Sequence, residues 1–129
     1  MNKKILVAGS ILGLLAVVLG ALAAHGLKES LTQEAMDAFQ TGVRYQMYHA
    51  ILLLFAGSTT YLKTKTKKWI YLTVIIGVLL FSGSIYGLAT NELTGFDFKT
   101  IGFVTPIGGF FLVISWILML LDFLKFKAE

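Results

Sequence analysis

Four long apolar blocks dominate the hydrophobic pattern of the chain. They cover residues 5–24, 42–62, 69–89 and 101–124, and polar segments separate them. Each block has roughly the 20 residues that a helix needs to cross the hydrocarbon core of a bilayer. Because lipid offers no partners to backbone amides, each crossing is expected to be helical. The pattern predicts an all-α integral membrane four-helix bundle with up-down-up-down topology, formed as a single transmembrane domain over residues 1–129.

The polar stretch 25–41 between the first two blocks has a helical pattern of its own. An apolar position recurs every four residues, at Leu31, Ala35, Phe39 and Val43. Ser30 with Gln33 three residues later has the pattern of a capping box. We therefore expect a short amphipathic helix here, which either lies on the outer membrane surface or extends the second span upward. Gly42 is the expected joint between this helix and the second span.

Composition supports a lipid environment. The chain is 57% hydrophobic and 14% charged, with a mean hydropathy of +0.80, which is outside the usual range of soluble domains. The net charge of +4 arises from Lys and Arg residues that lie between the apolar blocks. Since they form no basic face, nucleic acid is not an expected partner. The chain has no cysteine, which excludes a disulfide framework and a Cys nucleophile.

The basic residues predict the orientation in the membrane. Eight of them would lie on one side: Lys3, Lys4, Lys63, Lys65, Lys67, Lys68, Lys125 and Lys127. The other side would hold Lys28, Arg44 and Lys99. By the positive-inside rule, both termini and the loop at 63–68 are expected to be cytoplasmic. The first block also resembles a secretory signal, but its length of about 20 residues fits a retained span better.

The segment 44–49 (RYQMYH) is the most unusual stretch of the chain. At about 100° per residue, Arg44, Tyr45, Tyr48 and His49 fall in one arc of a helix, and Gln46 lies just beyond it. The expected orientation places polar residues of all four spans in the same outer leaflet. We therefore predict a polar pocket there, lined by His25, Arg44, Tyr45, Tyr48, His49, Ser82, Tyr86 and Thr105. A cation near helix starts suits a lipid headgroup or another small anion.

Each of these features also has a structural explanation. Arg44 is equally suited to reach the headgroups or to pair with Asp37 or Gln40, and the tyrosines fit an interfacial belt. Two histidines without a fixed acidic neighbour are a weak ligand set, so neither a metal nor another cofactor is expected. The sequence has no Ser-His-Asp spacing, Walker loop, dinucleotide fingerprint or HExxH, and an enzyme is therefore not expected. Asp122 is expected to pair with Lys125 or to contact water.

Small residues mark candidate packing faces of the helices. The candidates are Gly9, Gly13, Gly20, Gly83, Gly87, Pro106, Gly108 and Gly109. In membranes such residues let helix backbones approach closely. They predict packing within the bundle or, alternatively, a homo-oligomer formed through Gly9 and Gly13 or through Gly83 and Gly87. Pro106 is also expected to free a carbonyl one turn back, near Gly102.

Four ordered blocks of the chain resemble a known family. They are residues 20–27 (GALAAHGL), 44–50 (RYQMYHA), 81–88 (FSGSIYGL) and 105–109 (TPIGG). They look like the signature blocks of the small bacterial membrane proteins in domain of unknown function family 423, also called uncharacterised protein family 0382, which is related to transmembrane protein 256 of animals. The resemblance implies a bacterial inner-membrane protein with four spans and no established activity. It supplies no catalytic residues.

Three functions stay open at this stage. The first is binding of a lipid headgroup or small anion in the outer-leaflet pocket. The second is a structural or accessory role, in which the protein stabilises the membrane or a partner complex and the polar residues only join helices. The third is an oligomeric small-solute transporter or channel, although the aliphatic inner half of the spans gives no continuous polar path. The expected partners are membrane lipids and either a second copy or a partner membrane protein.

Overall fold

The chain folds into four antiparallel helices. The computed structural model describes residues 2–91 and 102–127, and these residues contain α1 (Asn2–His25), α2 (Gln33–Ser58), α3 (Thr64–Ala89) and α4 (Val104–Lys125). This confirms the predicted all-α four-helix fold. The expected start of the fourth span at 101 lies outside the described residues, and α4 itself begins at Val104.

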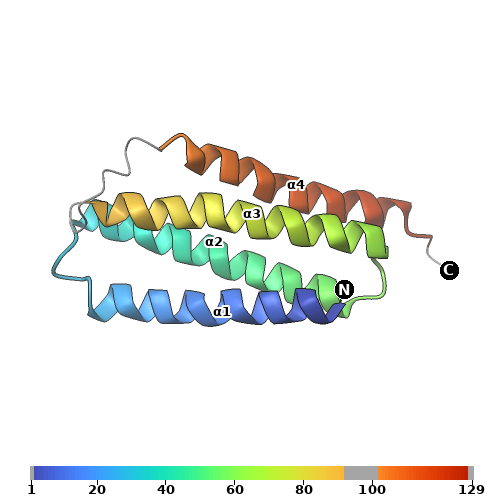
Figure 1. Cartoon of the computed structure of the whole chain (residues 1–129), viewed down its shortest axis with the longest axis horizontal. Coiled ribbons are helices and arrows are strands. Elements are labelled where there is room, and N and C mark those ends of the chain that lie inside the picture. Colours follow the sequence, from blue (N-terminus) through green and yellow to red (C-terminus); the bar gives the residue numbers. More distant parts are fainter. Residues whose placement is uncertain (1, 92–101, 128–129) are drawn as a thin grey trace.

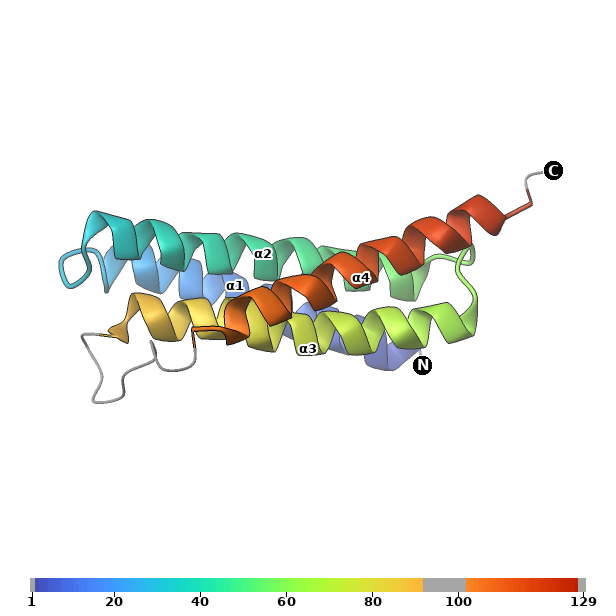
Figure 2. The ribbon, with the colours of Figure 1, turned by 90° about the horizontal axis from the view of Figure 1, so that it is seen from above.

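The pair α2 and α3 forms the middle of the bundle. Helices α1 and α4 lie on opposite sides of this pair (Figures 1 and 2). Backbones approach closely between α1 and α2, between α2 and α3, and between α3 and α4. Ile5, Leu53 and Val74 are fully buried at the centre of the core. Short connections keep neighbours in sequence adjacent in space, which gives this order of packing.

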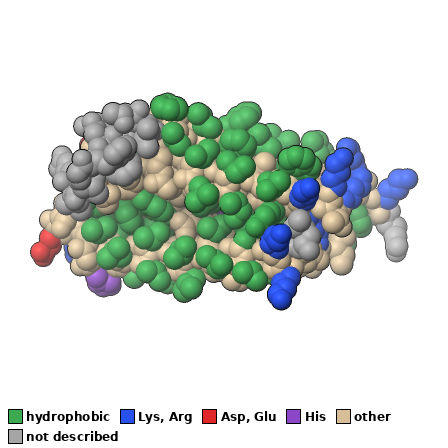
Figure 3. Space-filling model, viewed as in Figure 1, with side chains coloured by type: hydrophobic (Ala, Val, Ile, Leu, Met, Phe, Trp, Pro, Cys, Tyr) green, Lys and Arg blue, Asp and Glu red, His purple; other side chains and the backbone are tan. Residues whose placement is uncertain are grey.

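Three of the described helices, α1, α3 and α4, are long and apolar enough to cross a membrane. Their 24, 26 and 22 residues correspond to about 36, 39 and 33 Å at 1.5 Å per residue, more than the roughly 30 Å of a bilayer core. Large apolar side chains face outward, and Figure 3 shows them over the middle of the visible face. Helix α2 is more polar, but it lies alongside α1 and α3 over the same length. It must therefore cross with them.

The predicted amphipathic helix is the first part of α2. Helix α2 runs unbroken from Gln33 to Ser58, as the alternative of an upward extension required. Its N-cap is Thr32, whose hydroxyl accepts a hydrogen bond from the N–H of Ala35 at 3.1 Å. The predicted cap at Ser30 is wrong, because the N–H of Ser30 closes a preceding turn onto the carbonyl of Leu27.

Gly42 is not a joint but a close packing position inside α2. It is buried, and a Cβ atom at this residue would lie 2.7 Å from the ring of Tyr86. The glycine therefore permits α3 to approach α2, and the helix needs no bend there. The joint expected from the sequence was wrong because the absence of a side chain serves packing rather than backbone freedom.

Several glycines allow close helix approach in the same way. At Gly9, a Cβ atom would lie 3.0 Å from the carbonyl oxygen of Ala50. At Gly108, it would overlap the backbone nitrogen of Phe81. Looser contacts are made by Gly13, Gly20 and Gly109, whereas close contacts are also made by Gly57 and Gly77, which were not singled out from the sequence. Gly83 has no atom within 4 Å of such a Cβ position, and Gly87 is half-buried.

Pro106 lies in the first turn of α4. The N–H groups of a first turn have no acceptor within the helix, so a proline there removes no helical hydrogen bond. The carbonyl of Gly102, which was expected to be free, accepts a hydrogen bond from the N–H of Thr105 at 3.4 Å. The expectation of a freed carbonyl at this position was therefore wrong.

Candidate functional site

Gln46 of α2 connects three helices. Its side chain is 4% exposed. The Nε2 group donates to the carbonyl of Leu12 in α1 at 2.8 Å, and Oε1 accepts from the hydroxyl of Tyr86 in α3 at 2.7 Å. Because an amide is both donor and acceptor, one side chain ties α1 and α3 to α2.

A second link between α2 and α3 lies one turn away. The fully buried hydroxyl of Ser82 donates to the carbonyl of Gly42 at 2.7 Å. The ring of Tyr86 packs against Phe39, with 4.9 Å between ring centroids. The small surface of Gly42 gives both α3 side chains access to the backbone of α2. This contact therefore depends on glycine at position 42.

His49 joins α2 to α4. Its Nε2 accepts a hydrogen bond from the indole Nε1–H of Trp116 at 3.0 Å, and its Nδ1 lies 2.7 Å from the carbonyl oxygen of Tyr45. An indole N–H can only donate, so Nε2 carries no proton. His49 is therefore the neutral tautomer that donates from Nδ1 to Tyr45. Between α3 and α4, the hydroxyls of Ser84 and Thr105 form a further hydrogen bond.

These contacts form what we call the interhelical network. Its side chains are Gln46, His49, Ser82, Ser84, Tyr86, Thr105 and Trp116. It links every helix to another, with α2 in the middle. Within the described part of the chain, every buried side-chain nitrogen or oxygen has a hydrogen-bond partner. The polar interior of these residues therefore stabilises the bundle and leaves no buried side-chain nitrogen or oxygen without a partner.

The eight predicted pocket residues divide into two sets. His49, Ser82, Tyr86 and Thr105 belong to the interhelical network. The other four are exposed: His25, Arg44, Tyr45 and Tyr48. None of the eight lines any of the five best-defined cavities in the described ranges. The structure therefore uses four of them in contacts between helices and leaves the other four exposed.

Arg44 points away from the network. Its Nη2 donates to the hydroxyl of Thr41 at 3.0 Å. Asp37 instead accepts from Gln33 at 2.8 Å, so the predicted pairing of Arg44 with Asp37 or Gln40 is wrong. The three-residue spacing to Thr41 suits a contact on one helix face. Arg44 keeps an exposed charge on the outer surface of α2.

Two exposed aromatic side chains lie beside this charge. The rings of Tyr45 and Tyr48 are 40% and 50% exposed, and their centroids are 5.5 Å apart. Tyr45 also contacts Phe81 of α3, with 5.0 Å between ring centroids. These positions fit side chains that face lipid at the membrane interface.

Sequence reasoning missed the centre of the network. Gln46 was placed just outside the polar arc, while Trp116 and Ser84 were not considered. The available signal was energetic, since an amide or an indole N–H within a membrane helix needs a partner. The buried stripe of α2 also has helical spacing, because Gly42, Gln46, His49 and Leu53 follow one another at intervals of four, three and four.

A second polar cluster closes the opposite end of the bundle. Lys67 is 6% exposed, and its Nζ donates to the carbonyl of Thr59 at 2.6 Å and to Oδ1 of Asn2 at 3.1 Å. Asp122 is 8% exposed and accepts from the backbone N–H of Lys63 at 2.8 Å. Asp122 therefore pairs with the backbone of Lys63, and the prediction that it pairs with Lys125 is wrong. These contacts join the ends of α1, α2 and α4 to the start of α3.

Most of the basic side chains surround this same end. Both termini lie there, together with the connection between α2 and α3 (Figure 1). Figure 3 shows Lys and Arg side chains gathered at that end, which we call the basic end. The charge asymmetry along the bundle axis is the one that the positive-inside rule describes.

Four antiparallel helices with a paired polar interior and an apolar outer surface define a small multi-pass membrane protein. The chain belongs to the family described as "Protein of unknown function (DUF423)", whose sequence model matches residues 19–109. This confirms the family resemblance, while the relation to the animal protein stays a prediction.

Relatives match over almost their whole length. The UPF0382 membrane protein of Haemophilus influenzae is 36% identical over 128 residues, with 99% of each chain covered. YwdK of Bacillus subtilis, also a UPF0382 membrane protein, is 34% identical over 134 residues, with 96% of this chain and 98% of the relative covered. The UPF0382 inner membrane protein YgdD of Escherichia coli is 33% identical over 131 residues, with 99% and 95% covered. No solved structure matches the chain.

Proposed function

We propose that this protein is a non-catalytic membrane protein with a structural or accessory role, which stabilises the bilayer or a partner membrane protein through its lipid-facing surface. One observation carries the proposal: every buried polar side-chain atom in the described ranges is already paired within the chain. A ligand or substrate in the interior would have to break these hydrogen bonds. Each is worth on average about 0.6 and at most about 1.7 kcal/mol in a membrane.

The arrangement of His49 further supports a role without catalysis. A general base needs a free nitrogen within reach of a substrate or nucleophile. One ring nitrogen of His49 accepts from Trp116, and the other donates to Tyr45. The side chain therefore acts as a link between helices.

For the location, we propose the inner membrane of a bacterial cell, with both termini in the cytoplasm. The name of the Escherichia coli relative supports the membrane. The basic end supports the orientation, because cytoplasmic segments carry an excess of Lys and Arg.

Binding of a lipid headgroup or small anion at the outer leaflet is the second candidate function. The observation in its favour is the exposed guanidinium of Arg44, whose hydrogen-bond partner Thr41 is neutral. Tyr45 and Tyr48 flank it on the same helix, and such rings suit the headgroup region. This site would be an open surface formed by three of the eight predicted residues.

A transporter or channel is the less favoured alternative. The paired interior leaves no polar path, and four helices need an oligomer to enclose one. Gly9 and Gly13 contact α2 within the chain, so they are not free to join copies. Of the two glycine pairs predicted to join copies, this leaves the pair on α3, where Gly83 faces open space.

Thermal unfolding in detergent separates the first two candidates. A ligand that binds only the folded protein raises its stability by about 2.7 kcal/mol at a hundredfold excess over Kd. If the role is structural, phosphate, acetate and short-chain phosphatidylglycerol each shift the melting temperatures of wild type and Arg44→Gln by equal amounts. A ligand-induced rise in melting temperature that is lost only in Arg44→Gln would establish the outer-leaflet site and overturn the structural proposal. Lys28→Gln, which removes an exposed charge from the same end, is the matched control.

A further inference from the structure

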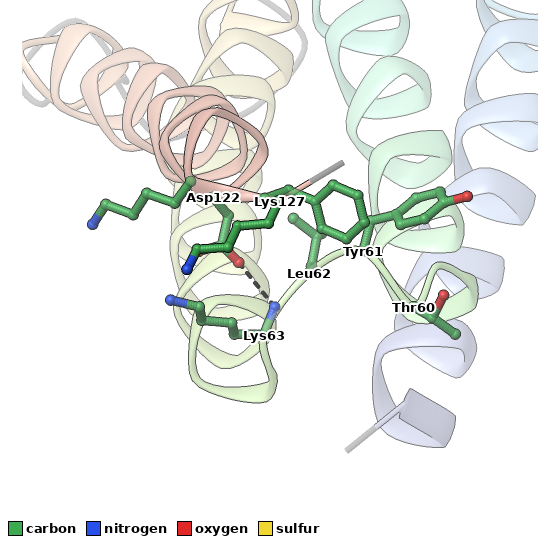
Figure 4. A pocket seen from close by; sticks show the side chains of 8 residues that line it. Thr60, Tyr61, Leu62, Lys63, Asp122 and Lys127 are labelled. Atoms are coloured by element: carbon green, nitrogen blue, oxygen red, sulfur yellow. Dashed lines mark hydrogen bonds between the residues drawn. The ribbon is translucent and has the colours of Figure 1, made fainter. Parts of the chain in front are cut away.

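A cavity of about 280 Å³ opens at the basic end of the bundle. It lies between the connection from α2 to α3 and the last turn of α4 (Figure 4). Its lining residues are Thr60, Tyr61, Leu62, Lys63, Asp122, Lys125, Phe126 and Lys127. None of them belongs to the interhelical network, so this cavity is independent of the site described above.

The single acidic group of the cavity is already used within the protein. Asp122 is 8% exposed, and its Oδ2 accepts from the backbone N–H of Lys63 at 2.8 Å, the dashed line in Figure 4. Lys63 is the N-cap of α3 and has no side-chain capping bond of its own. The carboxylate therefore lies at the positive end of the helix dipole and partly compensates it.

The three lysines of the cavity have no such partner. Lys63, Lys125 and Lys127 are exposed, and their ammonium groups form no ion pair with any residue in the described ranges. Figure 4 shows the side-chain nitrogens of Lys63 and Lys127 on the side of the cavity where the side chain of Asp122 lies. Among the described residues that line the cavity, three cations therefore face one anion. The three ammonium groups are hydrogen-bond donors that suit an anion.

The rim of the cavity is apolar as well as basic. The rings of Tyr61 and Phe126 pack edge to face with 5.0 Å between their centroids, and they are 58% and 50% exposed. An occupant that uses the whole site therefore carries a negative group beside a hydrocarbon chain. Free phosphate would use only the lysines.

We propose that this cavity binds the phosphate headgroup of an anionic phospholipid, with Lys63, Lys125 and Lys127 around the phosphate and the acyl chains along Tyr61 and Phe126. Basic pockets between membrane helices are suited to such headgroups. The lipid joins the connection between α2 and α3 to the end of α4, at the end opposite to the predicted outer-leaflet pocket. The proposal goes beyond the structural role and does not depend on it.

Native mass spectrometry of the protein in mild detergent tests this site directly. The probes are phosphatidylglycerol, phosphatidylethanolamine and inorganic phosphate, each titrated separately. We expect wild type to retain phosphatidylglycerol in preference to phosphatidylethanolamine. In Lys125→Gln/Lys127→Gln its affinity falls about 10- to 30-fold, since each lysine near an anionic surface contributes about a factor of five.

Lys65→Gln/Lys68→Gln is the matched control, because it removes the same charge from exposed positions outside the cavity. We expect it to change the affinity less than about threefold. Equal losses in the two double variants would reduce the effect to general surface charge and overturn the proposal. Tight retention of inorganic phosphate with no preference between the two lipids would overturn it as well.

Asp122→Asn tests the site independently of the lysine variants, because it is expected to strengthen the binding of phosphatidylglycerol. The amide oxygen can still accept from the N–H of Lys63, while the opposing charge is gone. We expect phosphatidylglycerol to bind several-fold more tightly, with an unchanged response to phosphatidylethanolamine. An unchanged or weaker affinity for phosphatidylglycerol would contradict a phosphate beside Asp122.

Discussion

At Gln46, one amide provides the contacts that give α2 its central position. A polar side chain in lipid is costly unless it is paired, and Gln46 is paired on both of its functional groups. Its neighbours in sequence, Tyr45 and Tyr48, face outward instead. Residues one and two positions apart on a helix point in different directions, so the short segment 44–49 serves both the interior and the lipid surface.

The first prediction concerns this amide. Gln46→Ala removes the acceptor of the Tyr86 hydroxyl and the side-chain hydrogen bond to the carbonyl of Leu12, and we expect the free energy of unfolding to fall by about 1–2 kcal/mol. Unfolding in mixed micelles with increasing dodecyl sulfate measures the change. Tyr48→Ala on the lipid-facing side should cost less than about 0.5 kcal/mol. Similar losses in both variants would argue against a stabilising network around Gln46.

At the scale of the helix, close approach depends on the absence of side chains at particular turns. Gly108 of α4 lies against the backbone of α3 at Phe81, and Gly77 of α3 lies against Leu112 of α4. These two positions fix the crossing of α3 and α4 from both sides. Gly83, although part of a similar spacing with Gly87, faces open space. A glycine pattern therefore identifies candidates, but it does not say which partner helix each one meets.

The second prediction separates these glycines. Gly108→Ala places a Cβ atom against backbone atoms that cannot move aside, so we expect a loss of about 1–3 kcal/mol in the free energy of unfolding. Gly83→Ala introduces no clash and replaces a poor helix former, so it should be neutral or stabilise by up to about 1 kcal/mol. Thermal melting followed by circular dichroism compares the two. A destabilised Gly83→Ala variant together with a neutral Gly108→Ala variant would contradict the packing of α3 on α4.

At the scale of the molecule, charge is distributed along the bundle axis. Both termini and the connection between α2 and α3 share the basic end, and the connection between α1 and α2 lies at the other end (Figure 1). Lys67 is an exception among the basic residues, because it is buried and holds the ends of three helices together. The remaining lysines of that end are exposed, and such side chains suit phospholipid headgroups.

The third prediction is the orientation itself. The natural chain has no cysteine, so single cysteines at exposed positions report on accessibility without interference. In intact bacterial cells, with the outer membrane permeabilised where there is one, we expect Ser30→Cys to react with a membrane-impermeant maleimide, while Lys65→Cys reacts only after lysis. The reverse pattern would mean that the positive-inside rule fails for this protein.

The sequence could predict the fold better than the site. Apolar length and the limits that lipid places on the backbone already require helices, which is why the four elements could be expected. The site depends on which polar side chains face each other across helices. The helical wheel grouped His49 with Arg44, whereas packing placed His49 against Trp116 and left Arg44 outside. Similarly, Ser30 and Thr32 both suit an N-cap, and the turn at Leu27 selected Thr32.

The sequence by itself determined that this is a helical membrane protein of a particular family, because hydrophobic length and residue order are properties of the chain alone. Only the tertiary structure decided that α2 is the central polar helix, that Gln46 and Trp116 complete its contacts, and that three lysines surround a cavity with Asp122. These features depend on distances between residues far apart in sequence. Such distances are fixed by the rotation and crossing of packed helices, which a helix's own periodicity does not specify.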